Sequence, residues 1–216
     1  MGTSSRKGTS KTLKKILNNY IDTSTKTFKP GQEEAACKEF TRKYLTQTRS
    51  SKGYFNPEKM SGMLQVGFGG LKKFCEKFET IDFSSEEDLK EEIRDFIEDN
   101  DELLTEDDEL QRNAYIAAMT KAIMASEDRD RVFVENIIIN VVKLGVISEF
   151  QESIVELTNT PISFDRLKEE IESSVKDYLK DSMEEIYEKT LAGDWKEIAK
   201  IIENIKRKLK KVEEDV

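Results

Sequence analysis

The residues best suited to covalent chemistry open the chain, where residues 1–5 read MGTSS. Removal of Met1, which is normal before a small residue, exposes the α-amine of Gly2. An α-amine has a pKa of about 8, well below that of a lysine ammonium, so part of it is an unprotonated nucleophile at neutral pH. We predict that Gly2 accepts a group from the active site of another protein. The residues that this active site would recognise are Thr3, Ser4, Ser5 and Arg6.

Two other interpretations of this opening exist. N-myristoylation requires Ser or Thr at the sixth position, and this chain has Arg6, so we expect no myristoyl group. A cloning remnant is the second alternative, because vectors often leave Gly-Thr-Ser. The same tripeptide recurs at residues 8–10, which a vector would not obviously produce. The sequence leaves the native and the vector origin open.

The residue inventory limits other chemistry. The chain has no histidine, which removes Ser-His-Asp and Cys-His catalysis and histidine-containing zinc sites. Its two cysteines, Cys37 and Cys75, are too few for a four-thiolate zinc site, and we expect reduced thiols. The acidic run 98–109 lacks the central glycine of a calcium loop, and the glycines of 67–70 lack the Lys-Ser/Thr ending of a P-loop. We therefore predict a protein that is not an enzyme and that binds no metal or cofactor.

Charge is distributed unevenly along the chain. The net charge is −9, but residues 1–77 hold 16 Lys and Arg against 6 Asp and Glu, whereas 79–109 holds sixteen acidic residues against two basic ones. The basic third predicts a contact with the chain's own acidic helices or with an acidic protein. The alternatives are a nucleic acid, for which no aromatic array stacks bases, and a merely solvated surface. The candidate docking residues are Phe40, Arg42, Lys43 and Tyr44.

The elements that would position these residues are helices. No glycine or proline interrupts residues 71–144, and no Asn-Gly or Asp-Gly hairpin signal occurs. We predict an all-α chain with a flexible basic N-terminal leader and linker over 1–31, which includes a short helix, and a helical bundle-like domain over 32–216. This domain divides into a basic part (32–77), an acidic body (78–193) and a C-terminal helix (194–213).

Capping residues predict where several helices begin. Asn56 followed by Pro57 is typical of an N-cap and a first helical position. Ser84 with Glu87 has the pattern of a capping box for the first acidic helix. Thr105 is expected to open the next helix.

Glycines predict where helices are interrupted. The glycines at 67–70 indicate a turn between two helices, at which small residues allow close packing or a kink. The apolar stretch 131–143 predicts a buried helix, which Gly145 would end before a shorter helix runs to about Leu157. A long helix is expected from about Ser163 to Ala192.

The last helix, capped by Asp194, has apolar residues spaced three and four apart over about two and a half heptads. These residues form a seam: Trp195, Ile198, Ile202, Ile205, Leu209 and Val212. We expect the seam to pack on its own domain, with a partner helix or self-association as the alternative. The cations expected to be exposed at its end are Lys206, Lys208, Lys210 and Lys211.

No window of the chain approaches the ~18 apolar residues of a membrane span. No apolar segment follows the first lysines, as one would in a secretory signal peptide. We therefore expect no membrane partner and a cytoplasmic location.

The opening residues MGTSS on a mobile leader resemble the B component of the Qat bacterial anti-phage defence system. The resemblance continues at 40–44 (FTRKY), 50–53 (SSKG) and 57–63 (PEKMSGM), which look like that family's basic helix, Gly/Ser turn and following Ser/Gly-rich helix. The leader departs from the family pattern, because the family often has a longer, proline-rich segment where this chain has the short helix-like stretch 11–21.

The resemblance implies that four proteins act together: an ATPase, this protein, an enzyme similar to the deazapurine-synthesising QueC, and a TatD-like nuclease. It implies that the QueC-like enzyme activates a carboxylate with ATP and transfers a 7-deazaguanine group to Gly2. The protein would then be a substrate and adaptor rather than a catalyst, and it would carry this covalent group on Gly2. The alternatives are an unmodified helical adaptor or coiled-coil interaction protein and a nucleic-acid-binding helical protein that uses residues 6–77.

Overall fold

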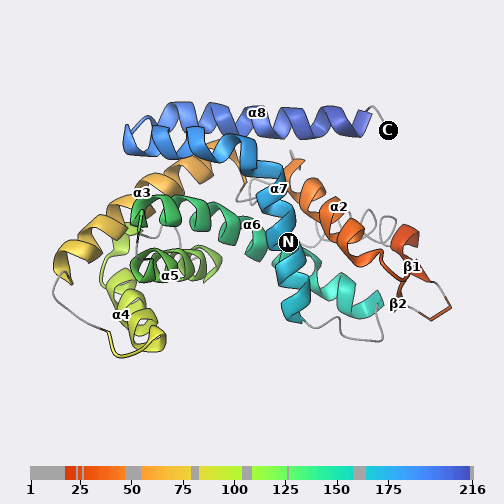
Figure 1. Cartoon of the computed structure of the whole chain (residues 1–216), viewed down its shortest axis with the longest axis horizontal. Coiled ribbons are helices and arrows are strands. Elements are labelled where there is room, and N and C mark those ends of the chain that lie inside the picture. The colour runs from red at the N-terminus through yellow and green to blue at the C-terminus, as the bar shows by residue number, and fades with distance from the viewer. Residues whose placement is uncertain are drawn as a thin grey trace, which may run out of the picture.

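The computed structural model describes residues 18–22, 24–25, 27–46, 55–78, 83–103, 109–125, 127–157 and 164–214. Most of these residues are helical, which confirms the all-α prediction (Figure 1). The helices are α2 (Glu33–Thr46), α3 (Pro57–Lys77), α4 (Glu86–Glu98), α5 (Glu109–Met124), α6 (Arg129–Leu157), α7 (Phe164–Leu191) and α8 (Trp195–Glu214). A short 3-10 helix, η1 (Asp101–Leu103), follows α4, and two-residue strands β1 (Ile21–Asp22) and β2 (Thr27–Phe28) precede α2.

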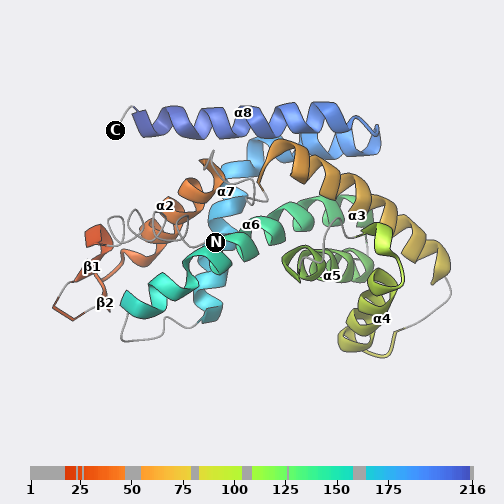
Figure 2. The same ribbon diagram turned by 180° about the vertical axis from the view of Figure 1, so that it is seen from behind.

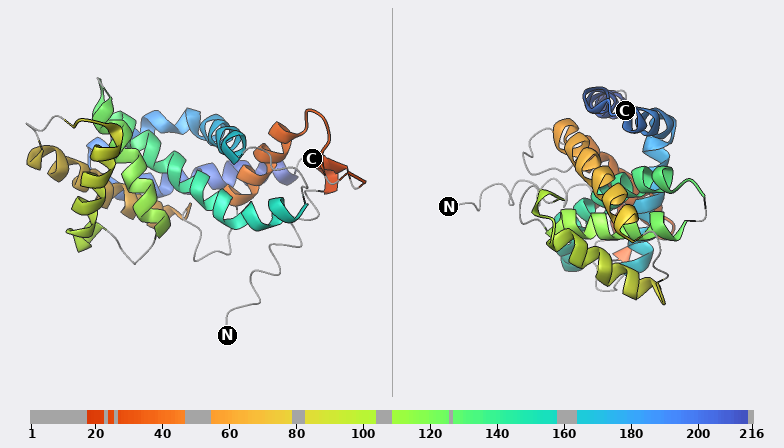
Figure 3. Two further views of the ribbon diagram at one scale, coloured as in Figure 1. Left: turned by 90° about the horizontal axis from the view of Figure 1, so that it is seen from below. Right: turned by 90° about the vertical axis from the view of Figure 1, so that its left-hand side faces the viewer.

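Helix α6 lies at the centre of the fold and contacts α5, α7, α2 and α3. Helix α8 lies along one side of the molecule, across α3, α7 and α2, while α4 lies at one end beside α5 (Figures 1 and 2). The molecule is elongated, and Figure 3 shows α8 nearly end-on in its right-hand view.

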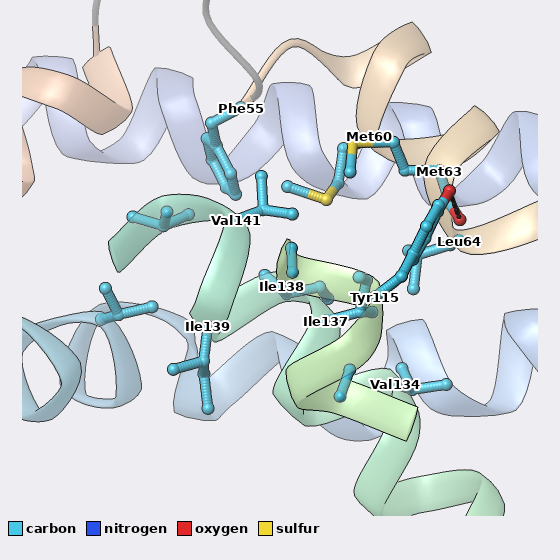
Figure 4. Packing of buried hydrophobic residues seen from close by; sticks show 14 of the residues in the cluster. Phe55, Met60, Met63, Leu64, Tyr115, Val134, Ile137, Ile138, Ile139 and Val141 are labelled. Atoms are coloured by element: carbon cyan, nitrogen blue, oxygen red, sulfur yellow. Dashed lines mark hydrogen bonds between the residues drawn. The ribbon is translucent and has the colours of Figure 1, made fainter. Parts of the chain in front are cut away.

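The predicted buried helix forms the first half of α6. Val134, Ile137 and Val141 are fully buried, and the surrounding helices cover this part of α6 on several sides (Figure 4). A helix that is apolar around most of its circumference must be enclosed in this way. The prediction that Gly145 ends the helix was wrong, because α6 continues to Leu157. Gly145 serves packing instead, since a side-chain carbon there would overlap the Tyr44 ring.

The glycines of 67–70 lie inside α3, so the predicted turn was also wrong. A role in close helix packing is confirmed for Gly67 and Gly70, whereas nothing lies within 4 Å of a Cβ at Gly69. A Cβ at Gly67 would come within 2.5 Å of the Tyr115 ring, and one at Gly70 within 2.7 Å of Leu103. The Tyr115 hydroxyl donates to the Met63 carbonyl at 3.0 Å, which holds α5 against α3.

Two helices begin at the predicted caps. The Asn56 side-chain oxygen accepts the N–H groups of Glu58 and Lys59 at 3.0 and 3.2 Å. The Asp194 carboxylate accepts the N–H of Glu197 at 3.3 Å. Each bond satisfies an N–H group that has no partner inside its helix.

The cap of α4 is Ser85, whose hydroxyl accepts the N–H of Asp88 at 3.1 Å, so the prediction of Ser84 was wrong by one residue. Each serine is followed three positions later by an acidic residue, and the sequence pattern alone does not separate them. Thr105 lies outside the described residues, and the described part of α5 begins at Glu109.

The seam of α8 packs on the rest of the chain, as expected. Ile198, Ile202 and Ile205 are buried, and α8 contacts α3, α7 and α2. The Ser61 hydroxyl on α3 donates to the Trp195 carbonyl at 2.6 Å. The side chain of Val212 lies outside the described residues.

Lys206 differs from the expectation of an exposed cation. Its side chain is buried, and its ammonium group donates to the Phe55 carbonyl at 3.1 Å. Burial lowers the pKa of Lys206, because desolvation disfavours the charged form of the ammonium group. The long aliphatic stem covers apolar surface while the charged end reaches a backbone acceptor. Lys208 and Lys211 are exposed and Lys210 is half-buried.

Candidate functional site

The predicted acceptor Gly2 and the recognition residues Thr3, Ser4, Ser5 and Arg6 lie outside the described residues. The described residues begin at residue 18 and include the point where the leader meets the helical domain. We call Tyr20, Glu39, Arg42 and Tyr178 the leader base, because they lie together where the described chain begins.

A small antiparallel ribbon follows Tyr20, where the sequence predicted only a linker. Ile21 pairs with Phe28 and Asp22 pairs with Thr27. The Asp22 carboxylate accepts the N–H of Ser24 at 2.8 Å, which closes the turn without an Asn-Gly or Asp-Gly pair. The ribbon therefore folds the chain back onto α2.

Tyr20 anchors the chain to α2. Its hydroxyl donates to the Glu39 carboxylate, and its ring is half-buried against the core. Burial first, and then the hydrogen bond and negative charge of Glu39, raise the pKa of Tyr20 to about 12. The phenol therefore stays protonated at neutral pH and donates this bond. The Lys29 ammonium adds a bond to the Asn19 carbonyl at 2.9 Å.

Arg42 and Tyr178 complete the leader base. The Tyr178 hydroxyl on α7 donates to the Lys38 carbonyl on α2 at 3.2 Å. Burial raises the pKa of Tyr178, whereas the nearby Arg42 guanidinium lowers the pKa of both Tyr178 and Tyr20. Arg42 therefore places a positive charge beside the residue that anchors the leader.

The candidate docking residues separate into two kinds. Phe40 and Tyr44 are 0% and 7% exposed, which corrects the prediction that their rings meet a partner. They lie on the side of α2 that packs into the core. Arg42 and Lys43 are half-buried at the edges of that side. The candidate docking surface is thus reduced to these two cations.

The two cysteines are free thiols, as expected. Burial, together with the negative charges of Glu170 and Glu33, raises the pKa of Cys37 to about 12, so this thiol is protonated at neutral pH. Cys75 is half-buried, and the Arg129 guanidinium donates to its sulfur at 3.5 Å.

Sequence reasoning missed a charged cluster that joins three helices. The Glu172 carboxylate on α7 accepts bonds from Lys143 on α6 at 2.9 Å and Lys176 at 2.8 Å, with Lys121 on α5 at 3.9 Å. Burial opposes ionisation, but the two hydrogen bonds and the lysine charges lower the pKa of Glu172 to about 2. Only the Glu172–Lys176 spacing of four residues was a signal in the sequence.

Within the described ranges, no helix combines the length and the apolar character needed to span a bilayer. The same residues contain no cluster of three or more acidic or cysteine side chains placed to hold a metal ion. Comparison with protein-family models, with curated proteins and with solved structures gives no match.

Proposed function

We propose that this chain is a non-enzymatic component of an anti-phage defence complex. In this proposal the Gly2 amine, freed by removal of Met1, accepts a 7-deazaguanine group from a QueC-like partner. The proposal is carried by the opening residues MGTSS and by the resemblance at 40–44, 50–53 and 57–63. The leader base supports it, because Tyr20 ties the chain to α2 after the acceptor segment and before the core helices.

The proposed chemistry needs only a nucleophile from this chain. The partner activates a carboxylate as an acyl adenylate, and the Gly2 nitrogen attacks the acyl carbon. AMP leaves, the amine loses a proton, and an amide bond forms. The product has no positive charge at its N-terminus. An α-amine suits this reaction because its pKa of about 8 leaves part of it unprotonated at neutral pH, unlike a lysine side chain.

Arg42 and Lys43 are the residues we propose for docking the partner. The Arg42 charge lowers the pKa of Tyr20, so a partner that binds this edge of α2 is held near the residue that ties the leader to α2. Reversal of both charges to Glu should weaken capture of the QueC-like enzyme and leave the helical signal in circular dichroism unchanged. Capture that is unaffected at physiological salt would argue that this edge is only solvated surface.

The test of the modification is the mass of the N-terminal peptide from cells that also make the QueC-like enzyme, the ATPase and the TatD-like nuclease. We expect a deazaguanine adduct on the wild-type peptide. Gly2→Glu should retain Met1 and lose both the adduct and phage protection. Gly8→Glu is the matched control, because it changes the second Gly-Thr-Ser copy and leaves the Gly2 amine intact. An abundant, unmodified and fully protective Gly2→Glu protein would overturn the proposal.

The coiled-coil alternative loses its main support in the structure. It relied on the α8 seam meeting a partner helix, whereas Ile198, Ile202 and Ile205 are buried against the chain's own helices.

A further inference from the structure

The outer side of α4 carries an excess of carboxylates, with Arg94 as an exposed cation among them. Its buried side consists of Leu89, Ile93, Phe96 and Ile97. A helical period of 3.6 residues places exposed acidic residues around the opposite side, and we call five of them, the last at the C-cap, the acidic stripe: Asp88, Glu91, Glu92, Asp95 and Asp99. Among the described residues, the ion pairs of α4 join Lys90 to Glu86 and Glu87, and none involves the stripe.

The acidic stripe opposes the stability of the isolated helix. Its members are three or four positions apart, so like charges face each other along α4. The helix dipole favours acidic residues in the first turn, but Asp95 and Asp99 are near the C-terminal end, where negative charge is unfavourable. The last turn of α4 holds no basic residue. A cation supplied from outside α4 would relieve both effects.

A basic groove lies between α7 and α8. Its cations are Arg207, Lys208 and Lys211, its carboxylate is Glu185, and the side chains of Ile201 and Ile205 also line it. The Arg207 guanidinium donates to the Asn204 side-chain oxygen at 2.6 Å. In the part of the chain that the structure describes, no carboxylate forms an ion pair with these three cations. The groove therefore has an excess of positive charge next to apolar surface.

The acidic stripe and the basic groove cannot meet within one copy. Helix α4 lies at one end of the elongated molecule, and the C-terminal part of α8 lies towards the other (Figures 1 and 2). A second copy offers a helix of the right charge that already projects from its end. A nucleic acid would be less suited, because the chain as a whole carries a net charge of −9. We propose that the basic groove of one copy binds the acidic stripe of a second copy, head to tail.

This contact uses two different surfaces, so each added copy leaves one stripe and one groove free. Such heterologous contacts build open lines or closed rings rather than only symmetric dimers. The contact is mainly electrostatic, so it is expected to be weak and strongly dependent on salt. The inference does not rest on the proposed function.

The test is sedimentation velocity of the full chain expressed alone and freed of nucleic acid. Self-association should weaken by about tenfold or more between about 50 mM and about 500 mM salt, because the Debye length drops severalfold. Two variants separate the surfaces: one carries Lys208→Glu and Lys211→Glu in the groove, and the other carries Glu91→Lys and Asp95→Lys in the stripe. Each variant should be monomeric by itself.

Mixing the two variants is the decisive step. The groove variant keeps its acidic stripe, which can bind the unchanged basic groove of the stripe variant. Association should return in the mixture, although both variants keep a net negative charge, since two reversals change −9 by only four charges. Lys180→Glu with Lys196→Glu is the matched control, because both lysines are exposed outside the groove and the charge change is the same. This control should associate like the wild type.

Three outcomes would overturn the proposal. One is a wild-type chain that stays monomeric at low salt, including one that binds a single-stranded oligonucleotide through the groove instead. Another is a mixture of variants that stays monomeric while circular dichroism shows both variants folded. The third is an equal loss of association in the control, which would indicate a general effect of net charge.

Discussion

Helices α6 and α4 contain isoleucines of equal burial in very different surroundings. Ile137 in α6 and Ile93 in α4 are both 0% exposed. Ile137 belongs to a helix that contacts α5, α7, α2 and α3, whereas α4 packs at one end of the molecule, chiefly on α5. The comparison indicates that burial of a side chain does not by itself measure how much of the fold depends on it.

The two helices also differ in how their neighbouring charges are arranged. Beside α6, the Glu172 cluster pairs one carboxylate with lysines from three helices. On α4, by contrast, the acidic stripe places negatively charged side chains next to one another. The centre of the molecule is therefore organised for stability, and the α4 end retains charges that reduce its own stability.

The largest expected effect comes from truncating one fully buried isoleucine in each of the two helices. Ile137→Ala should cost about 3–4 kcal/mol, and Ile93→Ala about 2 kcal/mol, because a peripheral helix can relax around the lost volume. Denaturant unfolding followed by circular dichroism measures both values. Equal costs would indicate that α4 is integrated into the core as tightly as α6.

The next effect concerns the close contact of α3 with the core. Gly67→Ala should destabilise the protein by about 1–3 kcal/mol, because its Cβ would overlap the Tyr115 ring. Gly69→Ala is the control, since nothing lies within 4 Å of its added carbon. It should raise stability by up to about 1 kcal/mol through better helix propensity. A Gly67→Ala protein as stable as Gly69→Ala would show that the Tyr115 ring moves aside freely.

The Glu172 cluster should give stability a defined dependence on pH. We expect Glu172→Gln to lower stability at neutral pH by about 1–2 kcal/mol. The pKa of Glu172 is lowered from 4.5 to about 2, so its contribution is complete above pH 4.5 and is lost as the pH falls towards 2. The difference between wild type and variant in thermal unfolding should shrink over this range. Glu188→Gln, at an exposed position of α7, should show no such trend.

The smallest expected effect is a gain of stability at the acidic stripe. Asp95→Asn should stabilise α4 by about 0.3–0.5 kcal/mol, because it removes like-charge pairs and an unfavourable charge near the helix C-terminus. Glu87→Gln should have the opposite sign, since Glu87 lies in the first turn and pairs with Lys90. Both effects should diminish at high salt in the same unfolding assay. A loss of stability in Asp95→Asn would contradict our account of the stripe.

Much of the helical fold was predictable because capping and apolar spacing are local signals. Asn56, Asp194 and the buried stretch 131–143 are examples. Gly67, Gly70 and Gly145 were misinterpreted because glycine weakens a helix, and its local effect indicates a break. Their actual role depends on Tyr115, Leu103 and Tyr44, which lie far away in the sequence. Nothing in the spacing of α3 or α6 identifies these partners.

The candidate site was less predictable than the fold. The acceptor role of Gly2 follows from amine chemistry and stays a prediction. The Tyr20–Glu39 bond joins residues 19 positions apart through a ribbon with no hairpin signal. The spacing of four residues places Phe40 and Tyr44 on one face of α2, but the spacing does not show that this face is turned into the core.

The bond from Lys206 to the Phe55 carbonyl has a consequence for synthesis on the ribosome. It joins positions 151 residues apart, so the start of α3 gains this partner only after α8 has been made. Until then, the side of α3 that carries Met60 and Ser61 remains uncovered by α8. A nascent chain arrested before α8 should therefore expose this apolar surface to chaperones, and release of the last helix closes it.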